Sequence, residues 1–547
     1  MTAAAYERVV AYHQATKHHF DRYARSAGFM DWANQPNPFR YFEGAEKLPL
    51  PLVPDTPDLP YDDLHTPVTG PPMPLNHKSL SSFLALSMGL SAWKKAGASR
   101  WALRINPSSG NLHPTETHLV LPAHGGSTGG VYHYVSFDHA LERRADLPEG
   151  IWPPMVSHFG GPGFLVALSS IHWRESWKYG ERAFRYCLLD AGHALAALSY
   201  AARLHNWMLT CLSGTSDRQI NTLLGFDRTS WHALEEEVPE LICWVSLEAG
   251  VGETGGDTVA QYLPDELVQP FQGLAFHGTP NPLSAKPVDW SVITEVSDAV
   301  RKSPTAPQPG HLEPMARSAI PTKRSAAGVI RQRRSAVNCH PQKSISTQTF
   351  YSILSPTLAG RGAPPFAALS MPASVHLLLF VHRVEGTLPG LYLLARRPDH
   401  LAGMQARWRK DFLWQPVQAG LPLYRLLEGD VTNDAMELSC HQEIAGQSAF
   451  AVAMVAAFEE NLRPTPYKYR HLHWECGMIG QVLYLGAEAH GIRGTGIGCF
   501  FDDPVHRLLG IENHAYQSLY HFTVGHPIED QRLETLPAYH HLDLARR

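Results

Sequence analysis

Residues 104–114 read Arg-Ile-Asn-Pro-Ser-Ser-Gly-Asn-Leu-His-Pro and form a polar, turn-prone segment between two apolar stretches. Proline fixes one backbone angle, glycine permits an otherwise forbidden one, and the serines and asparagines place short donors and acceptors near the main chain. These residue types predict a loop that can cradle a flat polar ring. An ordinary surface turn has the same composition, so both interpretations stay open at this point.

Two further segments are suited to binding an anion. Arg331-Gln332-Arg333-Arg334-Ser335 offers adjacent guanidiniums and a hydroxyl, and arginine forks match phosphate oxygens in pairs, although an exposed helix end favours the same cations. Residues 491–498 contain four glycines, whose backbone N–H groups could converge on an anion or a ring carbonyl; a tight turn is the alternative. Arg532, near the C-terminus, is another candidate cation for the same phosphate.

The composition limits the class of protein. The chain has 547 residues, 44% hydrophobic and 18% charged, which predicts two or more hydrophobic cores. A net charge of −5 without a dense basic patch argues against nucleic-acid binding. The longest apolar run, residues 449–458, is about half of a membrane span, so we expect a cytoplasmic protein with no membrane partner. The seven cysteines are scattered without a C-x-x-C pair, which predicts reduced, mostly buried thiols and no metal site.

The order of predicted elements repeats along the chain. The first cycle contains a long helix at 186–204 and strands at 118–121, 130–135, 164–168 and 241–247. The second cycle contains a long helix at 469–490 and strands at 375–381, 390–394, 450–454 and 520–524. Between the cycles, prolines are dense around 256–325, which predicts a linker with one helix.

The two cycles are also similar residue by residue. Arg185, Gly192, Asp217 and Gly225 recur 285 positions later as arginine, glycine, aspartate and glycine, without a gap. The chain therefore consists of two homologous halves, which suggests a fused dimer with pseudo-two-fold symmetry.

The two halves differ at the candidate binding segments. Residues 333–335 align with Val68-Thr69-Gly70, so the first half lacks the Arg-Arg-Ser cluster. With an offset of 258, residues 107–111 align with 365–369, Pro-Phe-Ala-Ala-Leu, so the second half lacks the polar loop. Each half keeps what the other has lost, and this complementarity predicts one composite site between them.

The sequence resembles the FMN-dependent nitroreductase superfamily, specifically its SagB/ThcOx-type dehydrogenase branch in a tandem, two-domain form. The motifs that carry the resemblance are Arg333-Arg334-Ser335, the Pro107–Asn111 loop, Tyr179-Gly180-Glu181-Arg182, Leu189-Asp190-Ala191-Gly192-His193, Gly480-Gln481 and Gly494-Thr495-Gly496-Ile497-Gly498. The resemblance implies an α+β fold of two tandem nitroreductase-like domains, each a mostly antiparallel sheet flanked by helices, that form an intrachain pseudo-dimer. It divides the chain into a wrapping segment (1–70), domain one (71–255), the linker (256–325) and domain two (326–547).

The resemblance also implies one FMN per chain, held between the halves. Its phosphate would be bound by Arg333, Arg334, Ser335 and Arg532. Its isoalloxazine or ribityl part would contact Pro107, Ser108, Ser109, Gly110 and Asn111. Backbone donors near the ring would come from Thr495, Gly496, Ile497 and Gly498. Family members often carry a basic residue two positions after the serine; Val337 stands there in this chain, and Arg104 is the candidate replacement.

Lys178-Tyr179 resembles a Lys-Tyr pair that azoline oxidases of this branch use to remove a proton. An ammonium beside a phenol lowers the pKa of the phenol and makes it a usable base, so both residues are candidate catalytic groups. Packing of Tyr179 beside a solvated lysine is the alternative. Asp190 and His193 lie along a predicted buried helix, and we interpret them as structural.

The sequence thus predicts an FMN-dependent oxidoreductase that transfers hydride to or from a small organic substrate. Azoline dehydrogenation, nitro or quinone reduction and flavin fragmentation all stay open. A peptide-heterocycle substrate would require a peptide-modifying partner, and NADH or NADPH is a candidate transient reductant. The fused halves predict that a monomer suffices. The alternative from another class is a flavin-free binding or scaffold protein that retains the fold.

Overall fold

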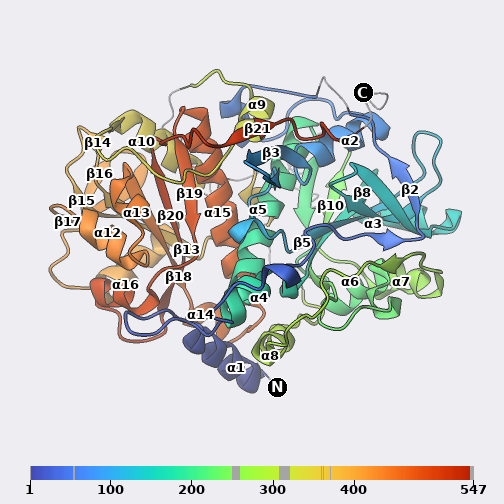
Figure 1. The fold of residues 1–547 in the computed structure, drawn as a ribbon, viewed down its shortest axis with the longest axis horizontal. Helices are drawn as coiled ribbons and strands as arrows, with labels where there is room; N and C mark the ends of the chain where they lie inside the picture. The colour runs from blue at the N-terminus through green and yellow to red at the C-terminus, as the bar shows by residue number, and fades with distance from the viewer. Residues whose placement is uncertain are drawn as a thin grey trace.

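The computed structural model describes residues 2–52, 56–248, 259–306, 321–358, 360, 363–369 and 371–542. Two halves lie side by side, with the second half in orange and red and the first in cyan and green (Figure 1). Helices α5 (Ala183–Leu204) and α15 (Lys468–Ala489) lie between the two halves and pack against each other. Within the described ranges, no helix is long and apolar enough to cross a membrane.

Each half contains a seven-stranded antiparallel sheet, and six of the seven strands follow the same order in both halves, whereas the first strand of each order comes from a different part of its half. In the first half the order is β2 (Glu46–Pro49), β7 (Ala140–Asp146), β6 (Gly130–Val135), β5 (Thr115–Leu121), β8 (Gly163–Ser170), β10 (Val238–Ser246) and β9 (Met208–Cys211). In the second half it is β16 (Gln415–Gln418), β17 (Leu421–Glu428), β15 (Gly390–Leu394), β13 (Val375–Val381), β18 (Phe450–Ala457), β20 (Tyr516–Gly525) and β19 (Arg493–Ile497).

The predicted repeat is present in the structure. The pair α5 and α6 (Asp217–Leu224) is followed 285 residues later by the pair α15 and α16 (Asp502–Leu509), with the same boundaries. The offset of 258 predicted for the preceding strand is wrong, because pairing aligns Leu121 with Gly130 and Val381 with Gly390, an offset of 260. The segment equivalent to the polar loop is therefore 367–371, Ala-Ala-Leu-Ser-Met, which still lacks its residues.

The contact between the halves is reciprocal. Arg185 pairs with Asp502 at 2.7 Å, and the equivalent Arg470 pairs with Asp217 at 2.8 Å. All four residues are buried. A pair repeated with exchanged roles is the property of a two-fold interface, so the two halves meet as the subunits of a symmetric dimer would.

Two glycines allow the long helices to approach each other at the centre of this contact. A Cβ on Gly192 would collide with the Trp474 carbonyl, and one on the equivalent Gly477 would collide with the Leu189 carbonyl. The apolar residues around this crossing belong to one hydrophobic core that includes side chains of both sheets. The halves consequently share a core, and the space between them is fixed by backbone contact.

Each end of the chain packs on the opposite half. In α1 (Thr2–Ala15) and just after it, His13 is hydrogen-bonded to Gln517 at 3.2 Å and Lys17 pairs with Asp503 at 2.7 Å. Near the C-terminus, β21 (Glu534–Leu536) pairs with β3 (Leu90–Ala96), which also pairs with β4 (Ser99–Arg104). The predicted domain boundaries remain predictions.

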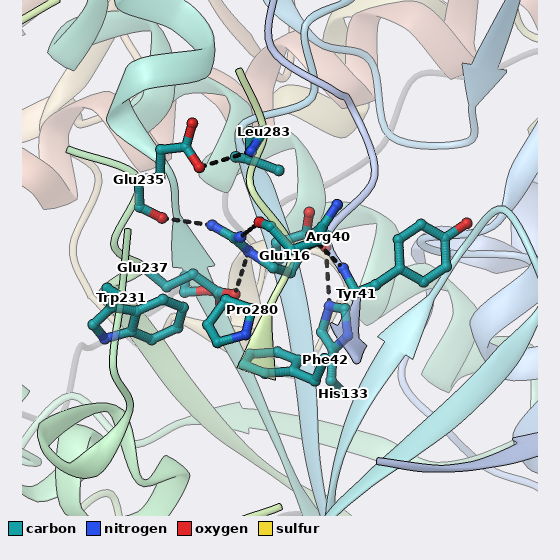
Figure 2. Close-up of polar contacts among 12 residues, drawn as sticks. Arg40, Tyr41, Phe42, Glu116, His133, Trp231, Glu235, Glu237, Pro280 and Leu283 are labelled. Carbon is teal, nitrogen blue, oxygen red and sulfur yellow. Dashed lines mark hydrogen bonds and ion pairs between the residues drawn. The ribbon is translucent and has the colours of Figure 1, made fainter. Parts of the chain in front are cut away.

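A buried charge cluster attaches residues 40–42 and 280–283 to the first sheet (Figure 2). Arg40 donates to the carbonyls of Glu235 and Asn281 and forms an ion pair with Glu237 at 3.6 Å. The backbone N–H of Phe42 donates to Glu142 at 2.9 Å.

The remaining elements cover the sheets or connect them. The helices are α2 (His77–Ala85), α3 (Trp152–Phe159), α4 (His172–Tyr179), α7 (Asp265–Val268), α8 (Ser291–Ala299), α9 (Ala326–Gln332), α10 (Thr347–Leu354), α11 (Leu401–Arg407), α12 (Thr432–Leu438), α13 (Glu443–Gln447) and α14 (Glu459–Leu462). The short strands are β1 (Phe42–Glu43), β11 (Thr279–Pro280), β12 (Ile345–Ser346) and β14 (Val384–Glu385).

Candidate functional site

A cavity of about 280 Å³ lies between the two halves. Its walls from the first half are Pro107, Ser108, Ser109, Gly110, Tyr179, Tyr186, Asp190 and His193. Its walls from the second half are Ser335, Gln442, Tyr484, Thr495, Gly496, Ile497, Gly498, Cys499 and Tyr520. The loop and the glycine-rich segment predicted from the sequence thus face one another across the contact between the halves.

A second cavity, of about 480 Å³, shares Pro107, Ser108 and Ser335 with the first. Five cationic side chains line it, against the two carboxylates of Glu529 and Asp530; the cations are Lys94, Arg104, Arg333, Arg334 and Arg493. This excess of positive charge at one end suits an anionic group. The two cavities together form the site that we call the interdomain cleft.

The polar loop is held in its shape by local hydrogen bonds and by α5. Gly110 and Asn111 both have φ of 60°, a left-handed conformation that glycine and asparagine adopt most easily. The backbone N–H of Ser109 donates to Asp190 at 3.1 Å, and its hydroxyl donates at 3.0 Å. The Asn111 amide donates to the Ala102 carbonyl at 3.0 Å, so this side chain fixes the loop.

Arg333, Arg334 and Ser335 follow α9, and the two arginines reach the first half. Arg333 is buried and donates to the carbonyls of Arg104 and Ile105 at 3.1 and 3.2 Å, while its Nε lacks a hydrogen-bond partner. Arg334 donates to the Ser91 carbonyl at 3.2 Å. The two arginines therefore bridge the halves at the cationic end of the cleft, where Ser335 also lines the wall.

The other two predicted cations have different positions. Arg104 lines the cleft, is buried, and donates to the carbonyls of Thr115 and Pro38, leaving Nε without a partner. The Arg532 side chain is 87% exposed, pairs with Asp530 at 2.7 Å, and does not line either cavity. Arg493, which the sequence reasoning did not select, lines the cleft and pairs with Glu529 at 2.7 Å.

The glycine-rich segment is the edge strand β19, a conformation that differs from the anion-binding turn the composition suggested. Its backbone pairs with β20, where Gly496 lies opposite Phe522. The Gly496 N–H donates to the Tyr484 hydroxyl at 2.9 Å, which is also 2.9 Å from the Ser335 hydroxyl. A Cβ on Gly496 would collide with the Tyr520 hydroxyl, so glycine is needed here for Tyr520 to lie against β19 in the wall of the cleft.

Lys178 and Tyr179 lie at the C-terminal end of α4, beside Gly110. The Lys178 ammonium is 5.2 Å from the centre of the Tyr179 ring, and only the tyrosine lines the cleft. The expected lowering of the Tyr179 pKa is wrong. Burial, followed by the carboxylate of Glu175, raises the pKa of Tyr179 well above its ordinary value, because both disfavour the phenolate.

Asp190 and His193 face the cleft, one helical turn apart on α5. Burial raises the pKa of Asp190 to about 7, opposed by hydrogen bonds from Ser108 and Ser109. Burial lowers the pKa of His193 to about 3, and the ring lies 3.2 Å from the Tyr520 hydroxyl. Both residues were interpreted as structural from their helical pattern, and Asp190 does position the loop.

Sequence reasoning missed the aromatic walls of the cleft. Tyr186, Tyr484 and Tyr520 belong to a helix or strand whose pattern reads as ordinary core. The repeat offers a signal for one of them, because Tyr484 corresponds to Ser199 in the first half. A large polar side chain replacing a small one beside Ser335 could have indicated a wall of the site.

Comparison with known proteins agrees with this architecture. Residues 330–526 match the model of the Nitroreductase family. A crystal structure assigned as a nitroreductase from Anabaena variabilis superposes with a TM-score of 0.69 over 95% of this chain and 99% of that chain, at 19% sequence identity. This similarity confirms the predicted fold class, two tandem nitroreductase-like domains of antiparallel sheets flanked by helices. No curated protein sequence matches the chain significantly.

Two further solved structures match less than half of this chain. A nitroreductase-type structure from Exiguobacterium sibiricum in complex with FMN matches 37% of this chain and 88% of its own, at 16% identity and a TM-score of 0.20. The E. coli microcin synthetase McbBCD complex with truncated pro-MccB17 includes a chain that matches 44% of this chain and 92% of its own, at 17% identity and a TM-score of 0.27.

Proposed function

We propose that this protein is an FMN-dependent oxidoreductase that holds one flavin in the interdomain cleft. The observation that carries the proposal is the composition of that cleft. The only Pro-Ser-Ser-Gly-Asn loop in the sequence, from the first half, faces the only Arg-Arg-Ser cluster, from the second half. Neither half alone supplies both parts.

The cationic end of the cleft fits a phosphate group. Arg333, Arg334 and Ser335 would hold it, with Arg493 in place of the predicted Arg532, whose side chain points to solvent. The unpaired Nε of buried Arg333 supports this assignment, because a buried donor without a partner is costly unless a ligand satisfies it. Arg104 lies at the same end and also has a free Nε.

The aromatic end fits a flat ring. Tyr186, Tyr484 and Tyr520 provide its walls, and Pro107 to Gly110 provide its rim. The combined volume lies within the usual range for cofactor pockets, roughly 300 to 1,000 Å³. Bound FMN would supply hydride transfer, the chemistry that side chains cannot provide.

The chain's own residues would manage the proton near the ring. The raised pKa of Tyr179 keeps its hydroxyl protonated at neutral pH, so in this state Tyr179 is a proton donor to a substrate atom in the cleft. Lys178 would act as a base partner only after a substrate changes the surroundings of the phenol. The finer assignment to a SagB-type azoline dehydrogenase rests on this pair and stays a proposal, as do a peptide-heterocycle substrate, a peptide-modifying partner and NAD(P)H as reductant.

Flavin retention tests the proposal. Purified protein should show the blue absorbance of flavin, or acquire it on addition of FMN and desalting. Arg333→Ala combined with Ser335→Ala should abolish retention, since both act at the cationic end of the cleft. Val68→Ala, at the position of the first half that is equivalent to Arg333, is the matched control and should retain FMN. Absence of FMN binding in the unmodified protein would favour the scaffold alternative.

A further inference from the structure

Two cysteines differ from the other five in their surroundings. Cys187, Cys211, Cys243, Cys339 and Cys476 are buried, whereas Cys440 and Cys499 are partly exposed. Cys499 directly follows Gly498 and lines the interdomain cleft. These two thiols are therefore the accessible ones, and one of them belongs to the wall of the proposed flavin site.

A turn after α12 and two hydrogen bonds bring the thiols together although 59 positions separate them. After α12, Cys440 and His441 adopt positive φ angles of 53° and 58°, which reverse the chain sharply. The Gln442 amide then donates to the Cys499 carbonyl at 3.0 Å, and the Phe501 N–H donates to the Leu438 carbonyl at 2.9 Å. In this frame the side chains of Cys440 and Cys499 lie close enough for each thiol to shift the pKa of the other.

The surroundings favour a thiolate on Cys499. The hydrogen bond from Cys440 lowers the pKa of Cys499 to about 5, with further contributions from His18 and Arg182. His18 accepts a bond from the Ala24 N–H on Nδ1, so its Nε2 carries the proton and donates to Cys499. The pair therefore shares one proton, with Cys440 as the thiol and Cys499 as the thiolate.

We propose that Cys440 and Cys499 form a redox-active dithiol that passes two electrons to the flavin in the interdomain cleft, which makes small thiols a class of reductant for this protein. The inference rests on the proposed function, because the flavin is the oxidant. One S–S bond forms and the Cys440 S–H bond breaks; the thiols lose two electrons and two protons, one already released by Cys499. The two electrons and the Cys440 proton would pass to the flavin, giving its two-electron-reduced form. Two molecules of a small thiol restore the dithiol by exchange and leave as their own disulfide.

The other close cysteine pair serves as an internal comparison. Cys211 and Cys243 lie directly opposite each other on β9 and β10, and both are buried. Burial raises the pKa of the Cys243 thiol well above its ordinary value. This pair has proximity without an accessible thiolate, so it should be inert.

The test uses the full chain without oxygen. Apoprotein is reduced, desalted and mixed with an equivalent of oxidised FMN in the dark. Flavin absorbance, alkylatable thiols and disulfide-linked peptides are then measured. We expect the loss of two thiols for each flavin bleached, and a Cys440–Cys499 linked peptide by mass spectrometry. Cys440→Ser and Cys499→Ser should each bind FMN that stays oxidised, while Cys211→Ala should behave like the unmodified protein.

The outcomes separate the two proposals. FMN that binds but stays oxidised, with all thiols alkylatable, would overturn the dithiol relay and leave the flavin site intact. FMN that passes through the desalting column unbound would overturn both. Bleaching that persists in Cys499→Ser would also contradict the relay, because the electrons would then come from elsewhere.

Discussion

Asp190 on α5 and Glu475 on α15 occupy equivalent positions in the two halves, but their surroundings differ. In the first half, Asp190 holds Ser109 and leaves the cleft open beside it. In the second half, the equivalent Glu475 accepts bonds from the Ser374 N–H and pairs with Arg396. The Arg396 guanidinium in turn lies 4.8 Å from the Phe366 ring centre, so a charge pair and a buried aromatic side chain occupy the region.

The edge strands show the same contrast. Gly496 on β19 lets the Tyr520 hydroxyl lie against the strand, whereas the equivalent Cys211 on β9 carries a buried side chain. Cys211 belongs to the same core as Phe366 and Leu369; Leu369 lies in the segment that replaces the polar loop, and Phe366 directly precedes that segment. Under the proposed function, the duplicated fold keeps one ligand site and converts the other into core, and the pseudo-symmetry makes each substitution in one half a control for the other.

The largest expected effect concerns the region of the second half that Glu475, Arg396 and Phe366 occupy, which we call the filled region. Glu475→Gln should lower the free energy of unfolding by about 3–5 kcal/mol, because it leaves the buried Arg396 without its counter-charge. Asp190→Asn removes no ion pair and should not destabilise the protein at neutral pH. Urea unfolding measures both. Equal losses would contradict the distinction between the filled and the open region.

The raised pKa of Asp190 also predicts that the free energy of unfolding depends on pH. Its pKa is raised from 3.8 to about 7, so the folded protein binds the proton more tightly than the unfolded chain. This stabilising contribution is complete below about pH 4 and is lost as the pH rises through about 7, a change on the order of 4 kcal/mol. The difference in stability between the unmodified protein and Asp190→Asn should follow this curve; a flat difference would contradict the assignment.

The helix crossing tests whether the halves are equivalent. Gly192→Ala and Gly477→Ala should each destabilise the protein by about 1–3 kcal/mol, because each new methyl group meets a backbone carbonyl of the other helix. Gly486→Ala, also on α15, is the control, since its nearest neighbour would be 3.5 Å away. The control should be neutral or stabilising. A large loss of stability at only one of the two glycines would contradict the equivalence of the two halves at the helix crossing.

The smallest effect is an exchange between the edge strands. Gly496→Cys introduces the residue of the filled region and should weaken FMN binding about tenfold, equivalent to about 1.4 kcal/mol, because it displaces Tyr520. Cys211→Gly, the reverse exchange, should leave FMN affinity unchanged. Quenching of FMN fluorescence during titration measures both. An effect of Cys211→Gly on FMN affinity equal to that of Gly496→Cys would indicate that flavin binds beside both edge strands, β9 and β19.

Much of the fold was predictable because the repeat multiplies weak local signals. The offset of 285 located α5, α15, α6 and α16 together, and β6, β13 and β15 have the predicted bounds. Strand β19 was missed because its glycines carry no strand pattern, and only pairing with β20 specifies it.

The site was predictable where residue type decides the role and unpredictable where neighbours do. The loop at 107–111 and the cluster at 333–335 were found from composition. The solvent-facing position of Arg532 follows from its pairing with Asp530, and the raised pKa of Tyr179 follows from burial and Glu175. Cys440 and Cys499 looked unrelated in the sequence because a turn after α12 and a hydrogen bond from Gln442 bring them together in the folded chain.

Flavin stoichiometry tests the central claim most directly. Protein saturated with FMN and freed of excess ligand should contain one FMN per chain, determined from the released flavin and the polypeptide concentration. Two FMN per chain would show that the filled region still binds flavin and would contradict the composite site. A value near zero would contradict the flavin assignment itself.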